Sequence, residues 1–414
     1  MSTTEVVVTG IGATTPLGGD VPSTWDGMIA GRSGITANAD WAVQHDLPSR
    51  LVAPLAVEPS EVLPRVLLRK MDRCEQVALI AARQAWADAG FPRPSDEHHP
   101  VDPDRLGVVI GSGMGGPVSL LAQYDLLRQG GARKVSPLAV PMLMPNGPAA
   151  YVGIELRARA GVHSPASACA SGAESLAHAW RMIRSGVADV VVAGGAEACI
   201  APLTVAGFAQ MRTLSQRNDD PDRASRPFDV DRDGFVIGEG AGVLVLESAE
   251  HARARGAAVY GRLAGAGITS DGYHITGLRP DGAGQVNAMR TAIRSAGLVP
   301  SDIGHVNAHA TSTVVGDISE AASIRAAVGD HPVLTAPKGS LGHLVGGAGS
   351  VEGIITLLSV YHGVVPATRN LDNQDPRVEL DVATGEPRKI RLDAAMTDSF
   401  GFGGHNVALV FTAA

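Results

Sequence analysis

The sequence predicts an α/β fold, in which buried strands alternate with helices. Short runs of β-branched and aliphatic residues, most with a glycine close by, are typical of buried strands. They occupy residues 5–9, 106–110, 190–193, 243–246 and 407–411. Helical patterns lie between them over residues 71–89, 171–185 and 350–362, and Gly90 follows the first in the position that favours glycine. Strands that alternate with helices of this length indicate a layered α/β protein.

Two segments of the chain are similar to each other and predict a duplicated architecture. Residues 169–176 open a predicted helix after a turn of small residues, and residues 343–353 open another in the same manner. A chain of 414 residues is long enough for two or three domains, or for one large duplicated domain. We therefore expect two halves of similar design, joined near residues 249–265.

Composition excludes several classes of protein. The chain has 34 basic and 42 acidic residues and a net charge of −8, which argues against a nucleic-acid binder. Hydrophobic residues make up 45% of the chain and charged residues 18%, so a disordered protein is excluded. The most apolar long stretch, residues 190–211, is interrupted by a glutamate, three glycines and a proline, and is too broken for a membrane span.

The first residues and the cysteines predict where the protein works. Residues 1–10 lack the basic and then apolar pattern of a signal peptide and are typical of a first strand. The 3 cysteines are widely separated and form neither a disulfide framework nor a CxxC metal pair. We expect a cytoplasmic protein with no nucleic-acid partner, no membrane span and no metal.

A glycine-rich segment, residues 111–116, fits the GxGxxG pattern of dinucleotide-binding folds. That motif needs a helix start at the pyrophosphate and an acidic residue about 20 positions later for the ribose. Pro117 suits a first helical turn, but no acid stands at the expected offset, because Asp125 comes too early. We interpret the segment as a structural turn.

Cys169 is the candidate nucleophile. Small residues surround it and a predicted helix begins immediately after it. The positive end of a helix dipole stabilises a thiolate, so we expect a lowered pKa for this thiol. A buried small hydrophobe is the usual fate of a free cysteine, and it is the interpretation that we prefer for Cys74 and Cys199.

His309 and His343 are the candidate partners of this cysteine. Both stand in loops of glycine and small residues, and such loops present side chains into clefts. His305 and His309 have the spacing of a helical metal pair, but their segment is typical of a strand that runs into a loop. The turn at residues 398–406 places two phenylalanines among glycines. It predicts either a tight connection or a backbone N–H donor beside a movable aromatic gate.

In this order, the segments resemble the β-ketoacyl-acyl carrier protein synthases, most closely the elongating, or synthase II, branch of high-G+C Gram-positive bacteria. The resemblance spans essentially the whole chain. Besides the cysteine and histidine segments, it is carried by residues 6–12, 192–197, 217–221, 224–229, 231–235 and 399–404. Several independent motifs at the right separations make chance agreement very improbable.

The resemblance implies the thiolase fold, a five-layered αβαβα sandwich of two similar halves. Residues 1–255 would carry the nucleophilic cysteine and residues 256–414 the two histidines. It also implies a homodimer that works without a cofactor. The activity would be an acyltransferase reaction of fatty acid biosynthesis. An acyl group on Cys169 would condense with malonyl-acyl carrier protein as CO₂ leaves, which lengthens the chain by two carbons.

The resemblance also implies a role for each residue that matches a family motif. Cys169 would be the nucleophile, and the backbone N–H groups of Cys169 and Phe400 would form the oxyanion hole. His309 and His343 would donate N–H groups to the thioester oxygen, with Lys338 as their support. The remaining matches are Thr311 and Thr313 for pantetheine; Asp317 and Glu352 as ordering carboxylates; Met114, Phe208 and Phe400 for the acyl tunnel and gate; and Arg69, Lys70, Arg133, Lys134 and Arg212 for docking the acidic carrier.

One residue departs from the family pattern, and some alternatives remain. Ala310 stands where the family usually has glycine, which costs about 1 kcal/mol if that position needs a positive φ. Residues 273–282 resemble the type II aromatic polyketide ketosynthases, which perform the same chemistry on another substrate. A thiolase would need a second catalytic cysteine near the C-terminus, and none follows Cys199. The remaining alternative is a scaffold or NAD-binding oxidoreductase that shares only the layered fold.

Overall fold

The computed structural model describes residues 4–37, 39–95 and 98–414 of the chain. All five predicted strands are confirmed, and they belong to one 11-stranded sheet. The strands of its N-terminal half are β1 (Val6–Thr14), β4 (Leu106–Gly111), β5 (Val162–His163), β6 (Val190–Glu197) and β8 (Gly240–Ser248). Those of its C-terminal half are β9 (Gly261–Ser270), β10 (His305–Asn307), β11 (Val333–Thr335), β13 (Asp381–Val382), β15 (Ala394–Gly401) and β16 (His405–Thr412).

The two halves of the sheet repeat one topology. The two halves meet where β1 pairs with β9, and in each half these are the first strands in chain order. Moving outward from this junction, the next strand in space is the last strand of that half in chain order, and then the strand before the last. The second and third strands follow, which gives β1-β8-β6-β4-β5 and β9-β16-β15-β10-β11, with β13 added at the far edge. The directions repeat as well, because both halves have a pair of antiparallel pairings followed by a pair of parallel ones. The expectation of two similar halves therefore has a structural counterpart.

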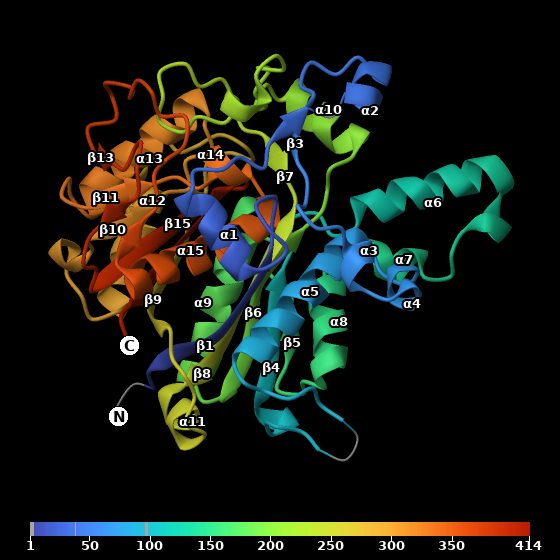
Figure 1. Cartoon of the computed structure of the whole chain (residues 1–414), viewed down its shortest axis with the longest axis horizontal. Helices are drawn as coiled ribbons and strands as arrows, with labels where there is room; N and C mark the ends of the chain where they lie inside the picture. The colour runs from blue at the N-terminus through green and yellow to red at the C-terminus, as the bar shows by residue number, and fades with distance from the viewer. Residues whose placement is uncertain (1–3, 38, 96–97) are drawn as a thin grey trace.

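Helices cover both faces of each half of the sheet (Figure 1). Helices α5 (Arg73–Asp88) and α8 (Gly147–Leu156) pack on the outer face of the N-terminal half. Helices α12 (Ala283–Ser295) and α13 (Val314–Ala327) cover the outer face of the C-terminal half. Helices α9 (Ser171–Arg184) and α15 (Ala348–His362) lie between the two halves, and their core includes residues of β4, β6, β8, β9 and β16. The five-layered α/β fold is confirmed.

Glycines let one helix of each half approach the first strand of that half. On β1, a Cβ at Gly12 would lie 2.1 Å from the carbonyl oxygen of Ala81 in α5. On β9, a Cβ at Gly267 would lie 2.0 Å from the carbonyl oxygen of Ala288 in α12. Gly10 and Gly265 make the matching contacts with the next turn of the same helices. This Gly-x-Gly against a row of alanines is a second, independent sign of the duplication.

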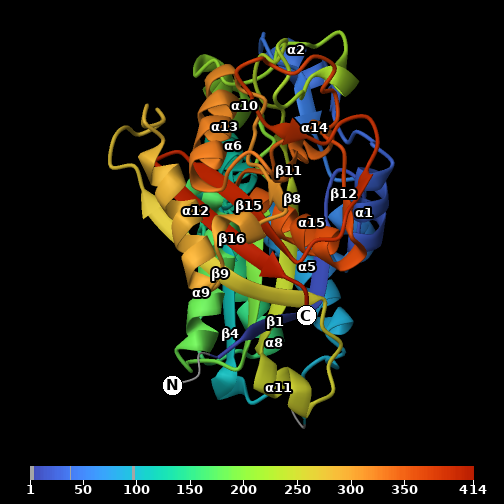
Figure 2. The ribbon, with the colours of Figure 1, turned by 90° about the vertical axis from the view of Figure 1, so that its left-hand side faces the viewer.

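Two helices project from this body on an arm. Helix α6 (Pro117–Gly130) starts directly after the glycine-rich turn, and α7 (Ala139–Leu143) returns toward α8 (Figure 1). Figure 2 shows another side of the molecule, where β15, β16 and β9 run beside one another above β1. None of the helices among the described residues is long and apolar enough to cross a membrane.

The predicted boundary between residues 255 and 256 falls between α11 (Ala249–Ala254) and β9, and it stays a prediction.

Shorter elements complete the chain. The remaining elements are α1 (Val21–Ile29), β2 (Thr36–Ala37), α2 (Ala39–Gln44), β3 (Leu51–Ala53), α3 (Pro59–Val62), α4 (Arg65–Leu68), η1 (Pro103–Arg105), η2 (Ala132–Lys134), η3 (Ala168–Ala170), α10 (Pro202–Gln210), η4 (Pro221–Arg223), β7 (Ile237–Gly238), α11 (Ala249–Ala254), η5 (Pro300–Asp302), α14 (Lys338–Leu341), η6 (Val345–Gly347), β12 (Val364–Val365) and β14 (Arg388–Lys389).

The strand glycines give the first testable prediction. Gly12→Val forces a side chain into the backbone of α5, so we expect a loss of about 2 kcal/mol or more in the free energy of unfolding. Gly267→Val is expected to cost a similar amount, because it repeats the contact in the second half. The control is Gly207→Ala in α10, where a Cβ meets no atom within 4 Å. Urea unfolding measures all three, and an unchanged midpoint for Gly12→Val would contradict the packing described here.

Candidate active site

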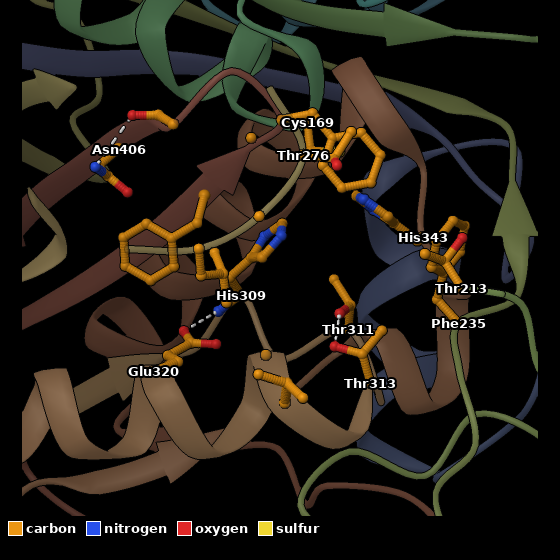
Figure 3. A pocket seen from close by; sticks show the side chains of 18 of the residues that line it. Cys169, Thr213, Phe235, Thr276, His309, Thr311, Thr313, Glu320, His343 and Asn406 are labelled. Carbon is orange, nitrogen blue, oxygen red and sulfur yellow. Dashed lines mark hydrogen bonds between the residues drawn. The ribbon is translucent and has the colours of Figure 1, made fainter. Parts of the chain in front are cut away.

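One cavity of about 280 Å³ brings together Cys169, His309 and His343, although they come from distant regions of the chain. Cys169 stands in η3, at the start of α9 in the middle layer. His309 follows β10, and His343 follows α14. Figure 3 shows the two histidine rings projecting into the same cavity as Cys169. The three side chains therefore lie together, as the sequence predicted.

The surroundings of Cys169 correct the expected pKa. The helix start does stabilise a thiolate, because the backbone N–H groups of Cys169 and Phe402 face the sulfur. The residue is only 9% exposed, however, and burial outweighs these contributions and raises the pKa of the thiol to about 12. The Lys338 ammonium lowers this pKa and the Glu197 carboxylate raises it. The prediction of a lowered pKa was wrong, because it left out the free energy of burying a charge.

The backbone N–H that faces the Cys169 sulfur belongs to a different phenylalanine from the one expected. Phe402, rather than Phe400, presents its backbone N–H to the Cys169 sulfur. Phe400 lies inside β15, paired with Asn406 of β16, whereas Phe402 lies in the turn between these strands, outside their pairing. The ring of Phe400 packs edge-on against His309, with the centroids 5.9 Å apart.

Burial keeps the two histidines uncharged. Their rings stand nearly perpendicular with centroids 5.4 Å apart. Burial, and then the positive charge of Lys338, hold the pKa of each imidazole well below 6.5. Among the described residues, Nδ1 of both rings finds no hydrogen-bond partner. Each neutral ring can therefore carry one N–H donor, which is the form needed to stabilise a developing negative oxygen.

Lys338 supplies the positive charge at this centre. It is 1% exposed and forms a salt bridge with Glu352 of α15, which is also buried. Burial raises the pKa of Glu352 to about 7, against the lowering effect of Lys338. A buried ammonium needs such a partner, because an unpaired charge in an apolar interior is costly.

Two carboxylates of α13 hold the loop that carries His309. Glu320 accepts the backbone N–H groups of His309 and Ala310, each at 2.6 Å. Asp317 accepts the N–H of Ser312 at 3.1 Å, so it orders the loop as the resemblance implied. Ala310 has a φ of 21° and Ser312 a φ of 69°, so the backbone here is held in an unfavourable conformation.

Glu320 was not among the residues predicted from the sequence. The signal was present, because Glu320 stands one helical turn after Asp317 and therefore shares its face of the helix. Burial raises the pKa of Glu320 to about 8.

Four of the five expected substrate-binding residues line the cavity. Thr311 and Thr313 line it, with their hydroxyl oxygens 3.1 Å apart. Phe208 and Phe400 line it as well. Met114 is not among the lining residues but packs against the buried cluster that contains Cys169 and Phe208.

The predicted structural role of the glycine-rich turn agrees with the structure. Its N–H groups are used internally, because Gly113 donates to Glu197 at 2.8 Å and Met114 at 3.3 Å. Gly115 donates to the hydroxyl of Ser112 at 2.9 Å. These donors are the groups that would cradle a phosphate, and a side chain of the protein already takes them.

The basic residues expected at the docking surface come from separate elements. Arg69 and Lys70 directly follow α4, and Arg133 and Lys134 lie in η2 on the arm after α6. Arg212 follows α10 and directly precedes Thr213, which lines the cavity.

His305 does not join the site. It lies on β10, and its Nδ1 is 2.7 Å from the carbonyl oxygen of Val333. Within residues 4–37, 39–95 and 98–414, no group of three or more His, Cys, Asp or Glu side chains is arranged to hold a metal ion.

Comparison with known proteins identifies relatives over nearly the whole chain. Residues 3–252 match the family model "Beta-ketoacyl synthase, N-terminal domain", and residues 260–372 match its C-terminal domain. A 3-oxoacyl-[acyl-carrier-protein] synthase 2 of Mycobacterium tuberculosis is 48% identical over 98% of this chain and 96% of its own length. The synthase of the same name from Synechocystis is 40% identical over 98% of this chain and 97% of its own length.

Solved structures give the same answer for the fold. A β-ketoacyl synthase from Burkholderia phymatum superposes with a TM-score of 0.91 at 35% identity, over 99% of this chain and 100% of its own. A type II polyketide ketosynthase, solved in complex with its acyl-carrier protein, superposes with a TM-score of 0.92 at 29% identity over the full length of both chains.

The raised pKa of Cys169 gives a prediction for its reactivity. Below the pKa of a thiol, the thiolate fraction grows about tenfold per pH unit, so alkylation of Cys169 by iodoacetamide should still accelerate between about pH 7 and about pH 9. Mass spectrometry of the modified peptide measures the rate, with Cys169→Ser as the control for alkylation of Cys74 and Cys199. A rate that levels off near pH 7 would show that the thiolate already dominates there.

Proposed function

The chain belongs to the β-ketoacyl synthase family, as an acyltransferase of the elongating synthase II type, and from this premise we propose how its residues perform the condensation. The reaction lengthens a fatty acyl chain by two carbons, with an acyl group on Cys169 and malonyl-acyl carrier protein as the second substrate. The observation that carries the proposal is the single cavity shared by a buried thiol and two uncharged imidazoles.

The first step transfers the acyl group to the enzyme. The Cys169 sulfur attacks the thioester carbonyl of the acyl carrier, the carbon–sulfur bond to the carrier breaks, and the thiol proton leaves with the departing pantetheine sulfur. An imidazole of the cavity can relay this proton, because both rings are neutral. The tetrahedral oxygen is stabilised by the backbone N–H groups of Cys169 and Phe402, with Phe402 in place of Phe400. Such donors are typically worth about 3 kcal/mol each.

The second step makes the carbon–carbon bond. The carbon–carbon bond to the malonyl carboxylate breaks and CO₂ leaves, while the electron pair passes into the thioester as an enolate. His309 and His343 donate N–H groups to the enolate oxygen as charge develops on it. The enolate carbon then attacks the acyl group on Cys169, and the Cys169 sulfur leaves as a thiolate, which takes up a proton from water to regenerate the thiol. Burial, and then the positive charge of Lys338, keep both imidazoles neutral, so the donor role depends in part on Lys338 and on its pairing with Glu352.

The cavity offers places for both ends of the substrate. The hydroxyl groups of Thr311 and Thr313 can bind the amides of pantetheine. The acyl chain needs an apolar channel, because each buried CH₂ contributes about 0.8 kcal/mol. The aromatic cluster of Phe208, Phe235 and Phe402 and the neighbouring Met114 supply apolar surface beside Cys169.

Surface residues suggest how the protein assembles. The arm exposes apolar side chains, with Leu120 50%, Tyr124 55% and Val140 62% exposed, and a homodimer would bury them. The acidic carrier would dock on the basic residues expected from the sequence, of which Arg212 directly precedes the cavity residue Thr213. The others are Arg69 and Lys70 after α4 and Arg133 and Lys134 of the arm. The cytoplasm, where acyl carrier thioesters are made, is the proposed compartment.

A second candidate is a type II polyketide ketosynthase, favoured by the close superposition on such an enzyme. Residues 276–278 line the cavity, so the loop that resembles this branch could select the substrate. The higher identity to the named synthases 2 favours fatty acyl substrates.

A variant of the nucleophile separates the two steps. Cys169→Gln removes the acyl acceptor but leaves both histidines, so we expect condensation to be lost while malonyl-carrier decarboxylation continues. Mass spectrometry of the carrier products, with saturated acyl carriers of graded length as substrates, measures both. If this variant still elongates chains, Cys169 is not the nucleophile.

The histidines provide the complementary control. His309→Ala or His343→Ala should lower decarboxylation by about 100-fold or more, while acylation of Cys169 stays detectable by intact mass. Decarboxylation at the wild-type rate in both variants would refute the proposed donor role.

A further inference from the structure

Glu197 is a buried carboxylate beside the cavity that the proposed reaction does not use. It ends β6, its side chain is inaccessible to solvent, and burial raises its pKa to about 7. A buried acid is costly unless its oxygens accept hydrogen bonds, so its partners indicate what it does.

The partners of Glu197 belong to two segments that are far apart in the sequence. From the glycine-rich turn it accepts the Ser112 hydroxyl at 2.9 Å, the Gly113 N–H at 2.8 Å and the Met114 N–H at 3.3 Å. From the loop after His343 it accepts the Gly346 N–H at 3.2 Å. One carboxylate thus joins the turn near Cys169 to the loop that carries His343.

The two joined segments are closely packed against each other. A Cβ at Gly346 would lie 2.5 Å from the Gly113 nitrogen and 2.9 Å from a Glu197 oxygen. A Cβ at Gly113 would lie 3.4 Å from the carbonyl oxygen of Ala168, the residue before the nucleophile. Val345 has a φ of 45°, which is rare for a β-branched residue and must be held by its surroundings.

We propose that Glu197 is a positioning residue of the condensation, which fixes the glycine-rich turn and the His343 loop in one arrangement about Cys169. This inference rests on the proposed function for its effect on turnover, but its effect on Cys169 can be measured without any acyl substrate. The charge of Glu197 opposes thiolate formation at Cys169, whereas Lys338 favours it. Among the described residues, the other titratable groups that line the cavity with Cys169 are His309, His343, Asp271 and Glu320, and Cys199 is buried in the same cluster.

Two variants separate the effect of the charge of Glu197 from the effect of its side-chain length. Glu197→Gln keeps the size and removes the charge, so the pH profile of iodoacetamide alkylation at Cys169 should move to lower pH by about half a unit or more. Glu197→Asp keeps the charge but is one methylene shorter, so the alkylation profile should stay near that of the unchanged protein. Both should lower kcat for condensation about tenfold or more, with little change in KM for malonyl-carrier, because Thr311 and Thr313 are not touched.

The matched control is Glu247→Gln. Glu247 is equally buried, on β8, and bonds Arg255 and His251, which do not line the cavity. We expect this variant to lower the melting temperature but to leave the alkylation profile, kcat and KM unchanged.

The outcomes decide between a positioning residue and a merely structural one. A shifted profile in Glu197→Gln and a lowered kcat in both variants support the proposal. An unshifted profile in Glu197→Gln together with unchanged kcat in both variants overturns it. The proposed function fails separately if the unchanged protein forms no condensation product. In that case a shifted alkylation profile in Glu197→Gln would still support the positioning of Cys169 by Glu197.

A milder variant keeps the test decisive if Glu197→Gln fails to fold. Ser112→Ala removes one of the four hydrogen bonds that Glu197 accepts and leaves its charge in place. A kcat at least about threefold below that of the unchanged protein supports the proposal, and an unchanged kcat contradicts it.

Discussion

The site depends on one constraint, which is that a buried cation stands beside two imidazoles that must remain neutral. Lys338 is nearly inaccessible to solvent and pairs with Glu352, so its charge stays in a dry interior. In that interior, the positive charge and the burial both oppose protonation of His309 and His343. A charged imidazole would be a donor too, but protonation of both rings would add a second and a third positive charge beside Lys338. The fold therefore keeps the histidines as neutral donors.

Duplication of the fold explains why these groups meet. Each half places a helix in the middle layer, and the two helices, α9 and α15, pack against the same core. Cys169 lies before α9, while Lys338 and His343 lie before α15, so the segment that leads into the middle-layer helix of each half supplies different groups to the cavity. The carboxylates Glu197 and Glu320 then fix the loops at this junction through backbone N–H groups.

The sequence was sufficient for five strands of the 11-stranded sheet, for the helices α5, α9 and α15 and for the three side chains that share the cavity, because each leaves a local pattern. Periodicity predicted α5 and α9 to within a few residues, and small residues marked the loops of Cys169 and His309. The pKa of Cys169 could not be predicted, because it depends on burial by segments distant in sequence. The sequence placed Phe400 and Phe402 in one turn, and only the register of β15 and β16 shows that Phe400 is paired within a strand while Phe402 lies outside the pairing. The sequence showed Glu197 only as the last residue of the segment 192–197. Its hydrogen-bond partners could not be predicted, because they lie 84 and 149 residues away in the chain.

The most direct test of this account is a pH titration of the histidine rings by NMR in the resting protein, with His309→Asn and His343→Asn used to assign the signals. The account predicts that the rings of His309 and His343 show no protonation between about pH 8 and about pH 5, while exposed histidines titrate near their usual pKa of about 6.5. Titration of either ring near pH 6.5 would mean that the cavity tolerates an imidazolium, and the central constraint would be wrong.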